Sequence, residues 1–246
     1  MKKSFETCTP EYLAFTFGIQ KVENNVSLLN CLDVRDLPKN EQHSDIQNLR
    51  KYIDQHLDSM NEHEFIAFVW QRMIEHINFY DRNRYQFFSQ RAFSAEIRDF
   101  NENLVILYGN VDFVVAQGNK EPKNCFFFLH QDQTQNNYEL DAKGHLLASM
   151  VAAQNQEVVY GCLMVGSWVY FASLEKRNYS ISTGFDIKSG DFYDILNVLR
   201  KIKQEIDKNI NKKGNLLHFN FEDLEEDNSD GWSDKEMMLA LKKIGV

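Results

Sequence analysis

The sequence predicts an α/β protein in which a central sheet is flanked by helices, and three observations support this. Apolar residues between 62 and 79 recur at spacings of three and four, the period of a helix that is buried along one side. Between residues 85 and 129 the pattern changes to aromatic and β-branched runs that are typical of strands. Helical and strand patterns then alternate to about residue 206, so the predicted order is helix, three strands, helix, two strands, helix.

Length and composition agree with a well-packed protein. The 246 residues are 43% hydrophobic and 26% charged and include only three prolines, which excludes collagen-like, low-complexity and wholly disordered chains. A chain of this length is expected to bury roughly 70% of its unfolded surface in one large domain, with or without an appendage. We predict a lead-in with a helix at residues 1–60, a core at 61–213 and an acidic tail at 214–246.

Two helices are predicted before the strands, one at the end of the lead-in and one at the start of the core. Residues 1–45 mix short apolar runs with turn residues, so no element is assigned there. Helices are predicted at about 45–58 and 62–79. Asn61 and Glu64 have the spacing of a capping box, which favours the start of the second helix at this point.

The strands of the predicted sheet follow these two helices. Strands are predicted at residues 87–93, 104–116 and 125–129, and the last of these is apolar on both faces, as expected in mid-sheet. A helix at 143–154 follows, then strands at 158–165 and 168–174 that are joined by a turn at Gly166 and Ser167. Apolar residues at helical spacing between 192 and 206 predict a last long helix.

Negative charge is concentrated near the C-terminus. Residues 221–236 contain eight acids and one base, so that segment carries −7 of the formal net charge of −9. The rest of the chain is nearly neutral, so the overall charge does not exclude a polyanionic partner. We expect a solvated tail with a short amphipathic helix at 233–244; a docking segment for a partner, or a polyanion that folds back over a basic groove, would fit the same residues.

Several features indicate the reducing cytoplasm. The N-terminus lacks the uninterrupted apolar run of a signal peptide, and no apolar stretch approaches the roughly 20 residues that span a bilayer. The four cysteines form no CxxC pair, and Cys125 and Cys162 are expected to be buried free thiols. The common sequence motifs of nucleotide-binding proteins, zinc metalloproteases and serine hydrolases are absent from the sequence.

Three segments in order carry a family resemblance. They are Gly109-Asn-Val-Asp112-Phe-Val-Val, Cys125-Phe-Phe-Phe-Leu-His-Gln131-Asp-Gln133 and Asp141-Ala-Lys-Gly-His145. The series resembles the PD-(D/E)XK nuclease superfamily, and it is most similar to a branch of largely uncharacterised bacterial proteins. The resemblance covers about residues 45–208 and implies a restriction-endonuclease-like fold with a mixed central sheet.

The resemblance also implies the positions of a catalytic site. In the family, two carboxylates on neighbouring strands hold Mg²⁺, and a lysine two residues after the second acid assists. Asp112 matches the first acid, but Gln131 stands at the second acid and Gln133 at the lysine. The loss of one such electrostatic group costs about 3 to 4 kcal/mol of barrier, so we expect little or no cleavage. No cofactor is expected; an active protein would use Mg²⁺ or Mn²⁺ at Asp112.

A shift in strand register would restore a second acid beside Asp112. A one-residue slip of the strand would turn His130 and Asp132 toward Asp112 in place of Gln131. The apolar alternation and the resemblance instead predict that Gln131 points inward.

Two predicted helices could also contribute polar groups to this site. Asp141 and His145, which flank Lys143 at a helix start, could share one ligand, although an aspartate there more often caps the helix. Glu64 or Glu75 could supply an additional acid, as some superfamily members do from the helix before the sheet. On spacing alone, both glutamates are expected to be solvated surface residues.

Residues 80–91 are a weak candidate for a segment that contacts nucleic acid. Arg82, Arg84 and Arg91 are interleaved with aromatic residues there, as in many proteins that bind single strands. The same pattern describes a turn from a helix into a strand with core aromatics.

Three functional hypotheses follow. The first is a catalytically degenerate nuclease-like protein that binds a nucleic-acid or protein partner. The second is an active Mg²⁺-dependent endonuclease that uses Asp112 with Asp132 or a helix glutamate. The third is a regulatory interaction module that acts through its acidic tail. The sequence does not determine the oligomeric state, and a homodimer is compatible with it.

Overall fold

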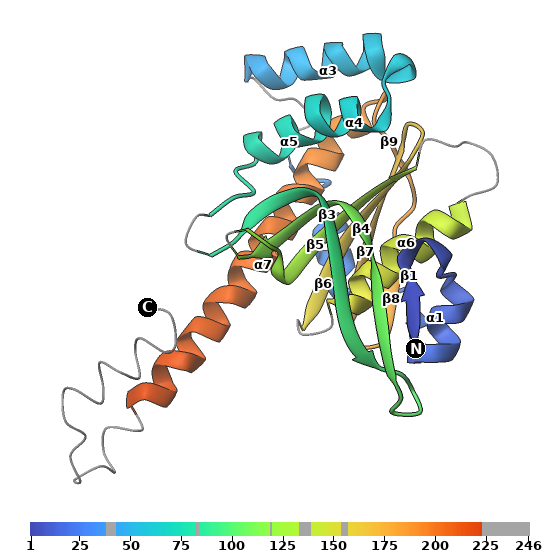
Figure 1. Cartoon of the computed structure of the whole chain (residues 1–246). Coiled ribbons are helices and arrows are strands. Elements are labelled where there is room, and N and C mark those ends of the chain that lie inside the picture. The colour runs from blue at the N-terminus through green and yellow to red at the C-terminus, as the bar shows by residue number, and fades with distance from the viewer. Residues whose placement is uncertain (38–42, 82–83, 119, 133–138, 154–156, 223–246) are drawn as a thin grey trace. The chain divides into compact units, whose positions relative to one another are not determined.

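The computed structural model describes all residues except 38–42, 82–83, 119, 133–138, 154–156 and 223–246 (Figure 1). It confirms an α/β fold with a mixed nine-stranded sheet flanked by helices. The strand order is β1 (Lys2–Ser4), β4 (Leu104–Gln117), β5 (Lys123–Asp132), β6 (Val158–Val165), β7 (Trp168–Glu175), β8 (Asn178–Ile181) and β2 (Gln20–Lys21). In addition, β3 (Gln86–Arg98) pairs with β4, and β9 (Phe185–Asp186) pairs with β7.

The helices of the described chain are mostly short. They are η1 (Phe5–Thr7), α1 (Pro10–Phe17), α2 (Val26–Leu32), α3 (Ser44–His56), η2 (Leu57–Ser59), α4 (Glu62–Phe65), η3 (Ile66–Trp70), α5 (Gln71–His76), α6 (Glu139–Ala152) and α7 (Asp191–Glu222). The chain divides into two compact units, Met1–Gln204 and Glu205–Val246, and the whole sheet belongs to the first. No helix within the described residues is long and apolar enough to cross a membrane.

The first 45 residues contain elements that were not predicted. β1 and β2 are strands of three and two residues, and α1 and α2 are helices of eight and seven residues. Because β1 pairs with residues about 100 positions later in β4, its stability comes from tertiary contacts that no local pattern reveals. The predicted lead-in therefore contributes directly to the sheet.

The helix that was predicted at 62–79 is interrupted by a π turn. Its expected capping box is confirmed, because Asn61 Oδ1 accepts from the Glu64 N–H and Glu64 Oε2 accepts from the Asn61 N–H, both at 2.9 Å. The backbone then changes from α4 to the π segment η3 before it continues as α5. A π turn inserts an extra residue and shifts the side chains that follow it around the helix axis.

Helices cover both faces of the sheet. On one face α6 packs its apolar side against the core cluster that includes Val114 and Phe128, and α1 contacts α6. On the other face Phe79, which follows α5, packs on Phe127 with ring centroids 5.6 Å apart. Phe127 and Phe128 thus serve opposite layers, as predicted for a strand that is apolar on both faces. All four cysteines are buried free thiols, which confirms that expectation for Cys125 and Cys162.

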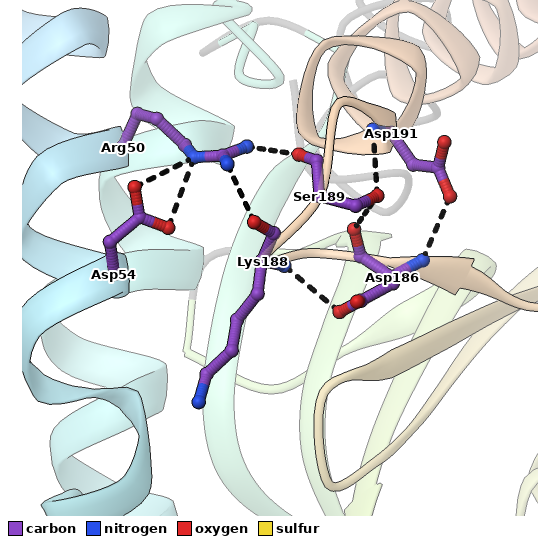
Figure 2. A network of polar contacts seen from close by, with 6 residues as sticks. All are labelled: Arg50, Asp54, Asp186, Lys188, Ser189 and Asp191. Carbon is purple, nitrogen blue, oxygen red and sulfur yellow. Dashed lines mark hydrogen bonds and ion pairs between the residues drawn. The ribbon is translucent and has the colours of Figure 1, made fainter.

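A polar network attaches α3 to the loop before α7 (Figure 2). The Arg50 guanidinium donates to the carbonyl of Ser189 and to that of Lys188, the latter at 2.6 Å, and pairs with Asp54 at 3.2 Å. Within the loop, the Asp186 carboxylate accepts from the Lys188 N–H at 3.0 Å. A single guanidinium therefore joins α3 to two carbonyls of this loop.

The β4 strand contains the feature that positions the candidate site. β3 pairs with β4 along nearly its whole length, so β1 and β5 must share the opposite edge of β4. β1 occupies that edge at residues 106–108, and β5 occupies it at residues 113–117. The edge thus forks, and among the residues that the structure describes, Gly109 to Asp112 have no strand partner on that side. Backbone groups inside such a gap require partners other than a neighbouring strand.

Candidate functional site at the fork of the sheet

Asp112 lies at the fork and binds groups from β5. The register places Phe113 opposite Leu129, so one residue further along Asp112 is opposite His130. Asp112 Oδ2 accepts a hydrogen bond from His130 Nδ1 at 2.7 Å and another from the Gln131 backbone N–H at 3.0 Å. The aspartate side chain thereby replaces the main-chain carbonyl that would pair with Gln131 in a continued ladder.

His145 from α6 satisfies the other side of the fork. Its Nε2 donates to the Asn110 carbonyl at 3.0 Å, and its ring stacks on His130 with centroids 4.0 Å apart and planes inclined by 29°. Next to His145, α6 also passes close to the backbone at Cys8, and this approach depends on Gly144, because a Cβ there would lie 1.9 Å from the Cys8 carbonyl oxygen. The three side chains Asp112, His130 and His145 are called the fork cluster below.

Burial and neighbouring charge set the pKa values in the fork cluster. Burial raises the pKa of Asp112, but the hydrogen bond and charge of His130 and the Gln131 N–H outweigh it and hold the pKa below its usual value. Burial, helped by the nearby His130, lowers the pKa of His145 to about 4. At neutral pH the fork cluster therefore contains an ionised aspartate and a neutral His145.

The arrangement has two chemical capacities. Asp112 and His145 close the polar gap in the sheet, which is a structural role. Asp112 also orients the His130 imidazole, because its carboxylate accepts a hydrogen bond from His130 Nδ1. The side chains of His130 and Asp112 are 16% and 14% exposed, so both are nearly enclosed.

The fork cluster does not fit a divalent cation. Within the described part of the chain, no group of three or more His, Cys, Asp or Glu side chains is arranged to hold a metal ion. Asp112 Oδ2 is already bound by two donors, and the nearest side chains are imidazoles, whereas Mg²⁺ prefers several oxygen ligands. The described residues thus provide one carboxylate where the resemblance implies two.

Gln131 does not share a face with Asp112, which corrects the expectation for this strand. His130 meets Asp112, and successive side chains on a strand project to opposite faces, so Gln131 projects to the other side of the sheet. It is inward in the sense that it is only 6% exposed, and its Oε1 has no hydrogen-bond partner among the described residues. Asp132 ends β5, but its side chain and all of Gln133 lie outside the described residues.

The helix glutamates lie away from Asp112. Glu64 is used in the capping box of α4, and Glu75 accepts from the Gln71 amide at 2.9 Å. Both belong to the helices on the Phe127 face, whereas Asp112 contacts the α6 side through His130 and His145. The structure does not bring either glutamate to the fork cluster.

The start of α6 differs from the prediction. The helix begins at Glu139 instead of Lys143, so Asp141 lies inside the first turn, with a side chain outside the described set. Lys143 Nζ lies 5.8 Å from the centre of the Tyr170 ring, a cation–π contact. Of the three helix candidates, only His145 is shown to reach the fork cluster.

The two described arginine candidates, Arg84 and Arg91, have separate surroundings. Arg84 Nε pairs with Asp81 at 2.6 Å, and its guanidinium lies 6.0 Å from the Tyr85 ring, so it stabilises the turn before β3. Arg91 is an exposed residue of β3, and Arg82 lies outside the described residues. The observed contacts agree with the alternative given for this segment, a turn from a helix into a strand with aromatic residues in the core.

Sequence reasoning missed the residues that form the gap itself. Gly109 accommodates the Phe5 ring, which a Cβ at that position would meet at 2.5 Å, and Asn110 offers the carbonyl that His145 binds. Both fall in a run that reads as an uninterrupted strand, so no sequence signal marks the fork. No protein-family model matches the chain, and no curated protein is significantly similar to it in sequence.

Proposed function

We propose that the protein is a restriction-endonuclease-like scaffold that binds nucleic acid without hydrolysing it. The proposal combines the resemblance of residues 45–208 with the state of Asp112, the one acid that this resemblance retains. A protein partner, and a regulatory role through the acidic tail, are the competing outcomes of the test below.

One observation carries the proposal. The Asp112 carboxylate is committed to His130 and to the Gln131 N–H, while the Gln131 side chain projects to the opposite face of β5. A nuclease of this class needs two anions and a cation on the same side of the sheet, because the metal must be held and the phosphodiester charge neutralised there. Nothing described around Asp112 replaces the missing acid and lysine.

The expected loss of cleavage rate supports a non-hydrolytic role. Removing a single electrostatic contributor to the transition state typically lowers the rate by about 10²- to 10³-fold. Two losses are not strictly additive, but together they place cleavage far below that of an intact site. Binding is affected less, because affinity for the phosphate backbone comes from many separate charge contacts.

The test compares binding and cleavage on the same substrates. Labelled single- and double-stranded DNA and RNA are incubated with the full chain in Mg²⁺, in Mn²⁺ and in EDTA, and bound and cleaved fractions are measured at several salt concentrations. We expect salt-dependent binding and no cleavage above background in any condition. Asp112→Asn is the matched variant, because its amide oxygen can still accept from the Gln131 N–H.

Each contrary outcome contradicts part of the proposal. Cleavage that requires Mg²⁺ or Mn²⁺ and is abolished in a folded Asp112→Asn variant would establish an active nuclease. Cleavage that persists in EDTA and is lost in His130→Gln would identify His130 as a metal-independent general base. If no nucleic acid binds, the nucleic-acid assignment is wrong, and a protein partner takes its place.

A further inference from the structure

A pocket of about 310 Å³ lies between the α4–α5 segment and β3, on the face of the sheet opposite the fork cluster. Its floor includes Phe87 and Phe113, and its rim includes His63, Gln71, Ser89 and Gln90. This pocket is called the α4–β3 pocket below. It belongs entirely to the unit Met1–Gln204 and does not include any residue named by the family resemblance as catalytic.

The floor is aromatic and flat. The Phe87 and Phe113 rings are 5.5 Å apart and inclined by only 17°, so they form a parallel stack. Phe113 is fully buried, whereas Phe87 is partly exposed and presents ring surface to the pocket. A planar ring that enters the pocket can extend this stack in an offset geometry, which aromatic pairs prefer.

The rim is polar but carries no permanent charge. Among the described residues that line the pocket there is no Asp, Glu, Lys or Arg. The rim instead offers two side-chain amides, a hydroxyl and an imidazole, which supply neutral donors and acceptors. The Gln90 amide donates to His63 Nδ1, which joins the two rim residues across the pocket. A neutral polar ring would find hydrogen-bond partners among these lining residues.

Two backbone irregularities meet at this pocket. Ile66 and Ala67, on its helical wall, belong to the π segment, and Gln90 on its strand wall has a φ of 48°, which is unusual for a residue with a side chain. Both features cost conformational energy, and both redirect side chains relative to a regular helix or strand. Irregularities that are stabilised together on opposite walls of one pocket favour a binding role over an accident of packing.

From these features we infer that the α4–β3 pocket binds an unpaired nucleobase. The aromatic floor stacks on the face of the base, and the amides of Gln90 and Gln71 and the hydroxyl of Ser89 bond to its edge. A base is planar, uncharged and bordered by donors and acceptors, and it therefore matches both the floor and the rim. The inference rests on the proposed binding of nucleic acid and specifies single-stranded segments as the ligand.

The test uses single-stranded oligonucleotides that contain one 2-aminopurine, whose fluorescence decreases when the base stacks on an aromatic ring. Titration with the full chain gives an affinity and a stacking signal from the same sample. Phe87→Leu keeps most of the apolar volume but removes the aromatic face. Gln90→Gly removes the amide, and glycine adopts positive φ without strain, so this variant is expected to fold.

Matched controls lie at the tip of the β3–β4 hairpin. Phe100→Leu makes the same change at an aromatic residue that is 61% exposed and outside the pocket. Glu102→Gly makes the backbone change of Gln90→Gly at a residue whose φ is 64°. We expect Phe87→Leu and Gln90→Gly to weaken binding by about 5- to 100-fold and to abolish the quenching, while the controls bind like the natural chain.

The outcomes separate the two proposals. If the natural chain binds the oligonucleotide but the pocket variants bind and quench as it does, the inference is wrong and the proposed function stands. If the natural chain does not bind any oligonucleotide, both fail. If a fully abasic oligonucleotide of the same length competes equally well, the pocket does not recognise the base, which also overturns the inference.

Discussion

Acid sensitivity of the fork cluster is the most direct quantitative consequence of the structure. Burial and the neighbouring His130 lower the pKa of His145 to about 4, against an ordinary value of 6.5 in the unfolded chain. Below about pH 6.5 the unfolded chain therefore binds a proton at this position that the folded chain does not bind. Stability rises with pH wherever the unfolded state binds more protons, so the free energy of unfolding must fall as the pH decreases from 6.5 to 4.

The magnitude follows from the same two values. The gap between a pKa of 6.5 and one of about 4 corresponds to about 3 kcal/mol, which is a large part of the stability of a typical domain. Asp112 contributes outside this interval. Its pKa is held below the usual 3.8, so its stabilisation is present above that pH and is lost only as the pH falls through its lower native value.

The assay is urea unfolding of the natural chain and of His145→Gln at pH 7.5, 6.5, 5.5, 4.5 and 4.0. The variant leaves the Asn110 carbonyl without its donor and is less stable at neutral pH, so the comparison uses the change with pH rather than the absolute value. We expect the natural chain to lose about 3 kcal/mol more than the variant between pH 6.5 and 4. His56→Gln, an exposed position at the end of α3, is the control and should behave like the natural chain. Parallel curves for the natural chain and His145→Gln would refute the reasoning.

Two further predictions concern packing and the polar network. Gly144→Ala should reduce the free energy of unfolding by about 1 to 3 kcal/mol despite the better helix propensity of alanine, because its Cβ would lie 1.9 Å from a backbone oxygen. Gly190→Ala, where nothing lies within 4 Å, is the control, and equal thermal melting of the two variants would contradict the prediction. Arg50→Met should cost about 2 kcal/mol, because the loop carbonyls lose charge-assisted bonds. Arg35→Met, at a side chain that is 87% exposed, should cost less than about 0.5 kcal/mol in the same urea titration, and a similar loss in both would show that the network is not stabilising.

Local periodicity was sufficient for the large elements of the fold. The stripe at 62–79, the apolar run at 125–129 and the strand pair around Gly166 all correspond to observed elements, because each depends on contacts that repeat along the chain. The elements it missed depend on distant partners. β1 is a strand only because β4 pairs with it, and β2 only because β8 does.

The candidate site was less accessible to sequence reasoning for a specific physical reason. A prediction of which residues share a face assumes strict alternation along each strand. On β3 the side chain that packs on this core before Gln90 is Phe88, an even-numbered residue. After Gln90 the side chains that pack on the same core are the odd-numbered Phe93, Ala95 and Ile97, so the face that each position presents is reversed. β4 reverses at the same level, since its core residues are Leu107 and Val111 before the reversal and Val114 and Ala116 after it. Strict alternation along β4 cannot place both Val111 and Val114 in the same core, so it cannot assign faces correctly on both sides of Asp112.

This reversal also links the two sites. Gln90 lies between Ser89 and Arg91, whose partners on β4 are Phe113 and Val111, so Gln90 and Asp112 occupy the same level of the hairpin. On one face the irregularity directs Asp112 toward His130 and the fork, and on the other it places Gln90 at the rim of the α4–β3 pocket. A regular hairpin would pair Gln90 with Asp112 and direct both side chains to the same face, so it could not provide both the side-chain partner for the Gln131 N–H and the polar rim. The conformational energy that the positive φ of Gln90 costs is therefore offset by both arrangements. Gln90→Gly removes the strain of this positive φ but does not restore the pairing with Asp112, so it should preserve the fork cluster while it alters the pocket.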